Sequence, residues 1–172
     1  MLSVIMLCVF GITNVHAEET ILDGTLDSFE EGTYMMKDEE GDGYWEIIIT
    51  DNDVAIPNYT EYWSSGNFSK TVSANYYNGG SLEVTMQAVF TGKITAGGGS
   101  SIYSVYDGYF QSTLYSTLSS SCVVLRSNST PENPAMGRYS QSVRKISNNE
   151  NKTFKLTLSL SYYGAATITI TC

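Results

Sequence analysis

The end of the chain alternates strictly between apolar and polar side chains, and this pattern limits how it can fold. Apolar residues occupy every second position through 154–162 and again through 168–172, with Lys, Thr and Ser between them. A period of two residues puts the apolar side chains on one side of an extended strand, whereas an amphipathic helix repeats every three or four residues. The sequence therefore predicts two half-buried strands in this region.

The phase of the two alternations predicts the turn between them. A three-residue loop at 163–165 sets Leu160 opposite Ile168, so that apolar side chains face each other, whereas a two-residue loop pairs an apolar face with a polar one. Three-residue hairpin loops place glycine in the left-handed position, and Gly164 is available for it. We therefore expect a hairpin here.

A second pair of alternating runs, 72–76 and 82–86, flanks the sequence Asn78-Gly79-Gly80. A three-residue loop at 78–80 aligns the two apolar faces, and a two-residue Asn-Gly loop does not. The sequence therefore predicts a second hairpin.

The rest of the chain has the composition of strands and turns, because Val, Ile, Thr, Tyr, Phe and Ser are interrupted by Gly and Asn. Further strands are expected at Thr33 to Met36, Tyr44 to Thr50, Gln87 to Ile94, Ser101 to Tyr106, Cys122 to Arg126 and Arg138 to Ile146. The strand from Tyr44 to Thr50 is apolar on both faces, which is typical of an interior strand. Apolar residues at every fourth position between Tyr106 and Leu118 fit a helix or a strand, and the many Ser and Thr residues favour a strand. We predict an all-β fold, a mostly antiparallel β-sandwich, with a small β-barrel as the alternative.

The first residues are typical of an export signal. Residues 1–10 are almost wholly apolar, and Val15-His16-Ala17 has the small-residue spacing that signal peptidase recognises. The apolar stretch is too short to span a bilayer, and no other transmembrane segment is expected after processing. The sequence thus predicts a cleaved signal peptide at 1–17, an acidic N-terminal segment at 18–43 and a β-sandwich domain at 44–172, in a secreted, extracellular protein. The alternative for the leader is a buried N-terminal strand.

The only histidine is His16, which processing would remove. A chain without histidine has no Ser-His-Asp or Cys-His nucleophile system and no imidazole metal ligand. We therefore expect no enzymatic activity and assign no catalytic residue.

Processing would also remove Cys8 and leave Cys122 and Cys172, an even pair. In an exported chain such a pair is most simply a disulfide, which here would close a loop of 51 residues. Two reduced, buried thiols are the alternative.

Charge is unevenly distributed along the chain. Residues 18–61 hold 14 acids and one base, whereas 62–172 hold four acids and eight bases. No dense basic cluster is present to displace the counterions of a nucleic acid, so nucleic acid is not expected as a partner.

One acidic segment has the spacing of oxygen ligands in a calcium loop. Asp38, Glu40 and Asp42 occupy alternate positions, a glycine follows, and Glu46 falls at the ninth position. The twelfth position is Ile49 rather than Glu, and no flanking helices are expected. The alternatives are a Ca²⁺ site and an acidic hairpin turn; no other cofactor is expected.

A second segment is rich in aromatic residues among Asn, Ser and Gly. Tyr59, Tyr62 and Trp63 lie in it, and Tyr76 and Tyr77 follow in sequence. Flat aromatic faces beside amides and carboxylates suit the C–H faces and hydroxyls of sugars, and protein-binding loops use the same residue types. These five residues are our candidates for binding a glycan or an extracellular protein. The alternative is that Trp63 anchors this loop in the core.

Catalytic carboxylates are the remaining route to hydrolysis, and Glu83 and Asp107 stand alone on strand-like runs. The leader, the acidic segment and the Tyr/Ser/Thr-rich strands ending in 153–172 together resemble small secreted β-domain proteins of Gram-positive bacteria (Firmicutes). The resemblance implies an extracellular β-domain. We expect a secreted non-catalytic binding domain for a glycan or a cell surface. The alternatives are a secreted effector, inhibitor or toxin-like protein that acts on a protein partner and, last, a carboxylate-dependent hydrolase.

Overall fold

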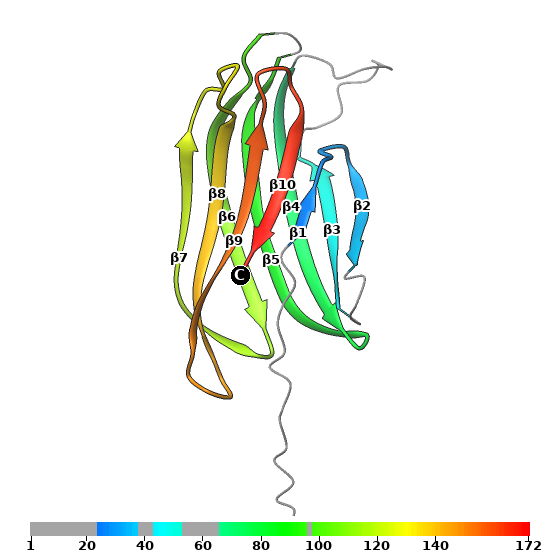
Figure 1. Ribbon diagram of the computed structural model, residues 1–172, viewed down its shortest axis with the longest axis vertical. Helices are drawn as coiled ribbons and strands as arrows, with labels where there is room; N and C mark the ends of the chain where they lie inside the picture. Colours follow the sequence, from blue (N-terminus) through cyan, green and yellow to red (C-terminus); the bar gives the residue numbers. More distant parts are fainter. Residues whose placement is uncertain (1–23, 38–42, 53–65, 96–97) are drawn as a thin grey trace, which may run out of the picture.

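The computed structural model describes residues 24–37, 43–52, 66–95 and 98–172. Within them the chain forms ten strands and no helix (Figure 1). The strands are β1 (Gly24–Leu26), β2 (Gly32–Lys37), β3 (Tyr44–Asp51), β4 (Gly66–Asn78), β5 (Ser81–Ile94), β6 (Ser101–Ser112), β7 (Tyr115–Arg126), β8 (Ala135–Lys145), β9 (Asn151–Leu160) and β10 (Ala166–Thr171). None of the described residues belongs to a helix long and apolar enough to cross a membrane. The leader at 1–17 lies outside the described residues.

The strands form two five-stranded sheets that pack face to face, which confirms the β-sandwich. Sheet A has the order β1-β10-β9-β8-β7, and sheet B has the order β2-β3-β4-β5-β6. Neighbouring strands are antiparallel throughout. Part of the acidic N-terminal segment contributes to both sheets, since β1 is an edge strand of sheet A and β2 is an edge strand of sheet B.

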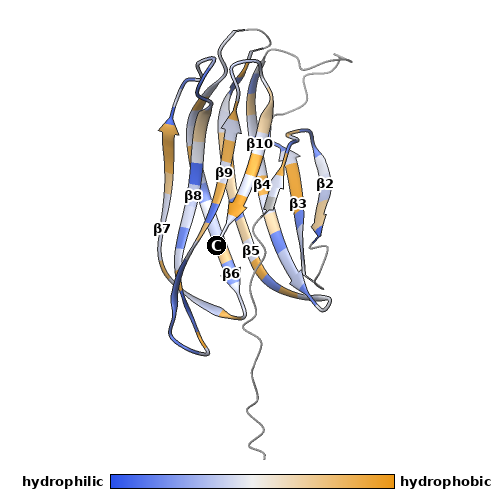
Figure 2. Cartoon of the chain, viewed as in Figure 1, coloured by the Kyte–Doolittle hydropathy of each residue, from blue (hydrophilic) through white to orange (hydrophobic). Residues whose placement is uncertain are grey.

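The core lies between the sheets and is built from alternate residues of their strands. On β9 the four inward side chains from Phe154 to Leu160 are fully buried, and the residues between them face outward or lie at the surface. Along the strands, Figure 2 shows the resulting change between hydrophobic and hydrophilic residues. Because burial follows a period of two, the hydrophobic pattern of each strand fixes which face it turns inward.

The hairpin of β9 and β10 forms as predicted, but its register differs by two residues. Leu160 pairs with Ala166 rather than Ile168, so the loop runs from Ser161 to Ala165. Ser161 closes this longer loop, because its N–H donates to Ala165 O at 2.8 Å and its Oγ accepts from Ala165 N at 2.9 Å. A shift of two residues leaves every side chain on its predicted face, which is why the face was predictable and the register was not.

The hairpin of β4 and β5 also forms, with a shorter loop than predicted. Asn78 pairs with Ser81, which leaves a two-residue loop of Gly79 and Gly80, both with positive φ. The register then shifts between Tyr77 and Tyr76, with Glu83 as the extra residue on β5. This bulge restores the alignment of the apolar faces that the short loop would have broken.

The other strand predictions are confirmed, because the predicted runs fall within β2, β3, β5, β6, β7 and β8, apart from Ile146, which follows the end of β8. Strand β3 lies between β2 and β4, and only Trp45, Ile47 and Ile49 point into the core, so it is buried on one face. The residues that carry the fourfold pattern, 106–118, form two strands rather than a helix. The first part belongs to β6 in sheet B and the last part to β7 in sheet A, and the chain crosses between the sheets at 113–114. Ser112 supports that crossing, since its Oγ accepts from Leu114 N at 3.0 Å.

The expected disulfide between Cys122 and Cys172 is not formed. Cys122 lies on β7 at one edge of sheet A, and Cys172 follows β10, with β8 and β9 between them. Three strand spacings correspond to about 14 Å, whereas a disulfide needs Cα atoms within about 7 Å. The prediction was wrong because an even number of cysteines carries no information about strand order.

Burial between the sheets changes the ionisation of Tyr139. The pKa of this phenol is raised from 10.0 to about 12, first by burial and then by the nearby Cys122 thiolate. Its hydroxyl donates to Gln141 Oε1 at 2.9 Å. Because the folded-state pKa lies above the unfolded value, the stability linked to this group is complete below pH 10 and is lost as the pH rises toward 12.

We therefore expect urea denaturation to show a smaller free energy of unfolding at pH 11 than at pH 9, because pH 9 lies below both pKa values of Tyr139, whereas pH 11 lies above the unfolded value of 10.0 and below the folded value of about 12. The Tyr139→Phe variant has no proton to lose, so its free energy of unfolding should fall less over the same range. An equal fall in both proteins would contradict this assignment.

Candidate functional site

The aromatic candidates are separated by the structure. Tyr59, Tyr62 and Trp63 lie outside the described residues. Tyr76 is only 4% exposed and its ring lies 5.2 Å from that of Trp45, so it belongs to the core rather than to a binding surface. Tyr77, its neighbour on β4, points to the opposite face of sheet B, because successive residues of a strand alternate sides.

Tyr77 belongs to a polar and aromatic cluster on the outer face of sheet B. Its ring stacks on Tyr44 of β3, with centroids 5.0 Å apart and planes 14° apart. Beside them Asn75 Nδ2 donates to Glu46 Oε2 at 3.1 Å, and Thr85 Oγ1 donates to Asn75 Oδ1 at 3.0 Å. The pKa of Tyr77 is raised, first by partial burial and then by the charge of Glu46. The cluster is a flat surface whose polar groups already bond to one another.

Glu46 is the one member of the candidate calcium set that the structure describes, and there it accepts the hydrogen bond from Asn75. Asp38, Glu40 and Asp42 lie outside the described residues. Within the part that is described, no three His, Cys, Asp or Glu side chains are grouped so that they could hold a metal ion. The Ca²⁺ site stays a prediction.

Glu83 and Asp107 do not form a catalytic carboxylate pair. Glu83 precedes Val84, which pairs with Ser112, whereas Asp107 lies next to the Val89–Tyr106 pair. The five residues from position 84 to 89 span about 16 Å of strand, and hydrolytic carboxylates work at roughly 5–10 Å.

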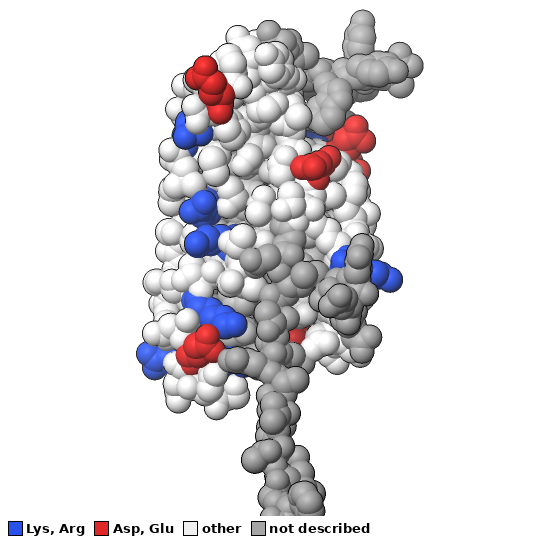
Figure 3. All heavy atoms as spheres, in the orientation of Figure 1, with Lys and Arg blue, Asp and Glu red and all other residues white. Residues whose placement is uncertain are grey.

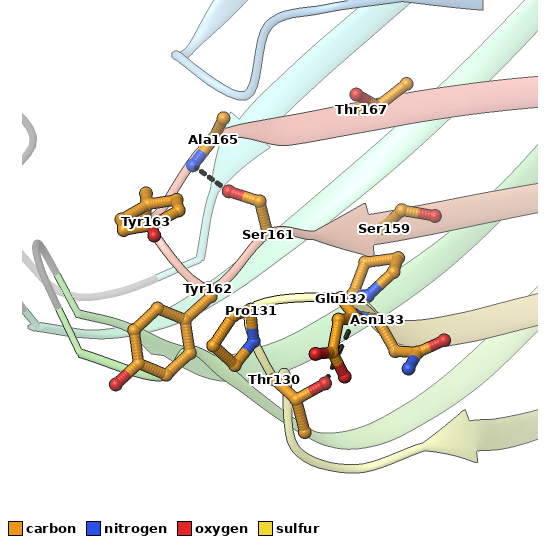
Figure 4. A pocket seen from close by; sticks show the side chains of 11 residues that line it. Thr130, Pro131, Glu132, Asn133, Ser159, Ser161, Tyr162, Tyr163, Ala165 and Thr167 are labelled. Atoms are coloured by element: carbon orange, nitrogen blue, oxygen red, sulfur yellow. Dashed lines mark hydrogen bonds between the residues drawn. The ribbon is translucent and has the colours of Figure 1, made fainter.

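A concave site lies at one end of the sandwich, between the β7–β8 loop and the β9–β10 loop (Figure 4). It is a shallow groove of about 260 Å³. Its lining combines aromatic rings, a carboxylate, an amide and hydroxyls: Glu132, Asn133, Ser159, Ser161, Tyr162 and Tyr163. We call it the end groove. It brings together residues that are about 30 positions apart in sequence.

The β7–β8 side of the end groove is a tight turn. Asn133 N donates to Thr130 O at 3.2 Å and to Thr130 Oγ1 at 3.1 Å, and Thr130 N donates to Asn133 O at 2.7 Å. Pro131 occupies the second position, where its fixed φ suits a turn. This closed turn presents Glu132 and Asn133 on a rigid backbone.

The other side of the end groove carries two tyrosines. The rings of Tyr162 and Tyr163 meet edge to face with centroids 5.4 Å apart, and Tyr163 is 70% exposed. Gly164 has φ +91°, so the chain turns sharply after the tyrosines, and its N–H donates to Ser161 O at 3.1 Å. Gly99 N in the β5–β6 loop donates to Tyr162 O at 3.1 Å, which anchors the aromatic pair to sheet B.

Two buried serines join the loops at this end of the sandwich. Ser100 N donates to Ser129 Oγ at 2.7 Å, and Ser129 N and Oγ donate to Ser100 O at 2.9 and 3.0 Å. Ser100 is fully buried and Ser129 is 7% exposed. Buried hydrogen-bonded polar pairs hold a unique geometry, so the loops are fixed before any ligand binds.

Sequence reasoning did not find the end groove. Its residues are ordinary turn residues, and the two tyrosines at 162–163 look like the end of an amphipathic strand. The segment Tyr162-Tyr163-Gly164 is aromatic and turn-forming, which was the one available signal. No protein-family model matches the chain, and no similar curated protein or solved structure was found.

Proposed function

We propose that the protein is a secreted, non-catalytic β-sandwich that binds a glycan in the end groove. One observation carries this proposal: a single rigid groove holds the Tyr162–Tyr163 pair together with the Glu132 carboxylate and the Asn133 amide. The apolar leader supports export, because an exported domain meets the polysaccharides of cell surfaces.

The lining suits a sugar better than an apolar ligand. A sugar ring offers a C–H face that packs on an aromatic ring and a rim of hydroxyls that exchange hydrogen bonds. Glu132 and Asn133 supply acceptors and donors, and Ser159 and Ser161 add hydroxyls. The groove is smaller than the usual 300–1,000 Å³ of small-molecule sites, which fits contact with one or two units of a longer chain.

Removing one tyrosine tests the proposal. We expect Tyr162→Ala to weaken glycan binding at least tenfold, about 1.4 kcal/mol, because the ring forms part of the wall of the groove. A glycan array followed by affinity electrophoresis on the glycans that bind would measure the loss.

Tyr103→Ala is the matched control, because Tyr103 is 58% exposed on β6 and does not line the groove. Its affinity should equal that of the unaltered protein. Equal loss in both variants, or no glycan bound by the unaltered protein, would overturn the proposal.

A specific observation favours the second candidate, an effector or inhibitor acting on a protein. Exposed apolar side chains gather at the β6 and β7 edges of the sandwich: Tyr103, Tyr106, Tyr109, Leu118, Val123 and Leu125. Such side chains are typical of protein interfaces. Binding of an extracellular protein that survives Tyr162→Ala would favour this candidate.

A further inference from the structure

The outer face of sheet A is a flat surface of hydroxyls. On β8, β9 and β10 the outward positions alternate with buried core residues, and most of them are Ser or Thr, among them Ser140, Ser142, Thr169 and Thr171, whereas Thr157 on the same side is only 7% exposed. Ser159 and Thr167 belong to the same face and also line the end groove. The face and the groove therefore form one continuous surface.

Basic side chains lie along this face. Arg138 and Arg144 are outward on β8, and Lys155 is outward on β9. Figure 3 shows Lys and Arg side chains in a column over β8 and β9, whereas the chain as a whole carries a net charge of −9. The middle of this face is therefore positive, opposite in sign to the protein as a whole, whereas acidic side chains lie beside the two ends of the column and Asp27 accepts a hydrogen bond from Thr167 Oγ1 at 2.8 Å.

Arg138 and Lys155 are neighbours. Arg138 pairs with Thr157, and Lys155 pairs with Ser140, so Arg138 and Lys155 are diagonal partners across β8 and β9, with their Cα atoms about 7–8 Å apart. Arg138 Nε donates to Thr157 Oγ1 at 3.2 Å, which orients the guanidinium along the face. Two positive charges on neighbouring positions of adjacent strands repel each other.

No acidic side chain neutralises the pair in the part of the chain that the structure describes. The ion pair found there joins Lys70 and Asp51, on sheet B. An anion placed between Arg138 and Lys155 would relieve the repulsion, and the hydroxyl residues Ser140 and Thr171 flank Lys155 on the two neighbouring strands.

We propose that this face binds an acidic polysaccharide that continues out of the end groove, with a carboxylate or sulfate group held between Arg138 and Lys155. The inference rests on the proposed function, because the groove supplies the sugar contacts and the face adds selection by charge. Arg144, six residues further along β8 and about 20 Å from Arg138, would meet a second acidic group of the same polymer.

A polysaccharide fits this face better than the other polyanions. Nucleic acid needs dense basic clusters that neutralise many neighbouring phosphates, and this face carries separated charges among hydroxyls. Membrane surfaces bind through clustered cations together with apolar side chains that enter the headgroup region, and the centre of this face is hydroxylated. A sugar chain uses both charges and hydroxyls.

The test compares polymers that differ in charge. The probes are polygalacturonate, its methyl-esterified form, heparin, duplex DNA and anionic phosphatidylserine vesicles. We expect at least tenfold tighter binding of polygalacturonate or heparin than of the methyl-esterified polymer in low salt. The double variant Arg138→Gln/Lys155→Gln should lose this preference.

A control with the same change in net charge is Lys37→Gln/Lys93→Gln, two exposed lysines of sheet B, which should keep the preference. Lys155→Gln alone should reduce it, and a thermal melt of each variant shows that it is folded. The inference is overturned if the unaltered protein has no preference, if the double variant keeps it, or if DNA or vesicles bind as tightly as the acidic polysaccharides.

The same measurements separate this inference from the function on which it rests. Tyr162→Ala should weaken binding of the acidic and the esterified polymer alike, whereas Arg138→Gln/Lys155→Gln should weaken binding of the acidic polymer only. If the tyrosine variant weakens both polymers and the double variant weakens neither, the glycan groove stands and the acidic face is wrong.

Discussion

Replacing Trp45 by alanine is expected to lower the free energy of unfolding by about 4 kcal/mol. The side chain is fully buried near the start of β3, between Met36 of β2 and Tyr76 of β4, and its ring lies 5.2 Å from that of Tyr76. Alanine would remove the whole indole from the core and leave a cavity between the sheets that the surrounding side chains fill only in part. A protein of this size should melt about 10 °C lower.

Urea denaturation of Trp45→Ala measures this loss, with Tyr103→Ala as the comparison. Tyr103 is also a large aromatic residue of a strand, but it is 58% exposed, so its removal should change stability by about 0.5 kcal/mol at most. Similar losses in the two variants would mean that Trp45 is not in the core.

The second large effect is expected from a single methyl group. Gly92 of β5 is buried where the register of β5 and β6 shifts. A Cβ at this position would collide with the backbone oxygen of Ser101 and would lie 2.7 Å from Cζ of Phe68. Since the backbone oxygen belongs to the neighbouring strand, it cannot move without disturbing β6. Gly92→Ala should therefore destabilise the fold by about 3 kcal/mol.

Gly98→Ala is the matched control, because a Cβ at Gly98 meets no atom within 4 Å and the residue has no positive φ. Its midpoint in urea should stay within the error of the unaltered protein, or rise slightly because alanine restricts the unfolded chain. A Gly92→Ala midpoint equal to that of Gly98→Ala would show that β5 and β6 do not approach closely at this point.

The strands were predictable because their signal is local. The alternation through 154–162 can be seen within a few residues, and it identifies both the strand and its buried face whatever the strand pairs with. The two hairpins followed from the same pattern, because the buried faces of the two strands in each hairpin must match. The loop lengths did not follow, since a shift of two residues or a compensating bulge at Glu83 satisfies the same pattern.

Features that depend on strand order were not predictable. Cys122 and Cys172 are separated by two intervening strands, and no pattern within either strand reveals this. The end groove likewise requires that the β7–β8 and β9–β10 loops meet at one end of the sandwich.

By itself, the sequence determined that this chain is an antiparallel β protein with one dry and one wet face on most strands, because a period of two is a property of each strand alone. Only the tertiary structure decided which wet face carries Arg138 beside Lys155 and which loops enclose Tyr162, because neighbours across strands come from distant parts of the chain. The physical reason is that the alternation of polar and apolar side chains can be recognised within one strand, whereas a binding surface depends on the order in which the strands pair.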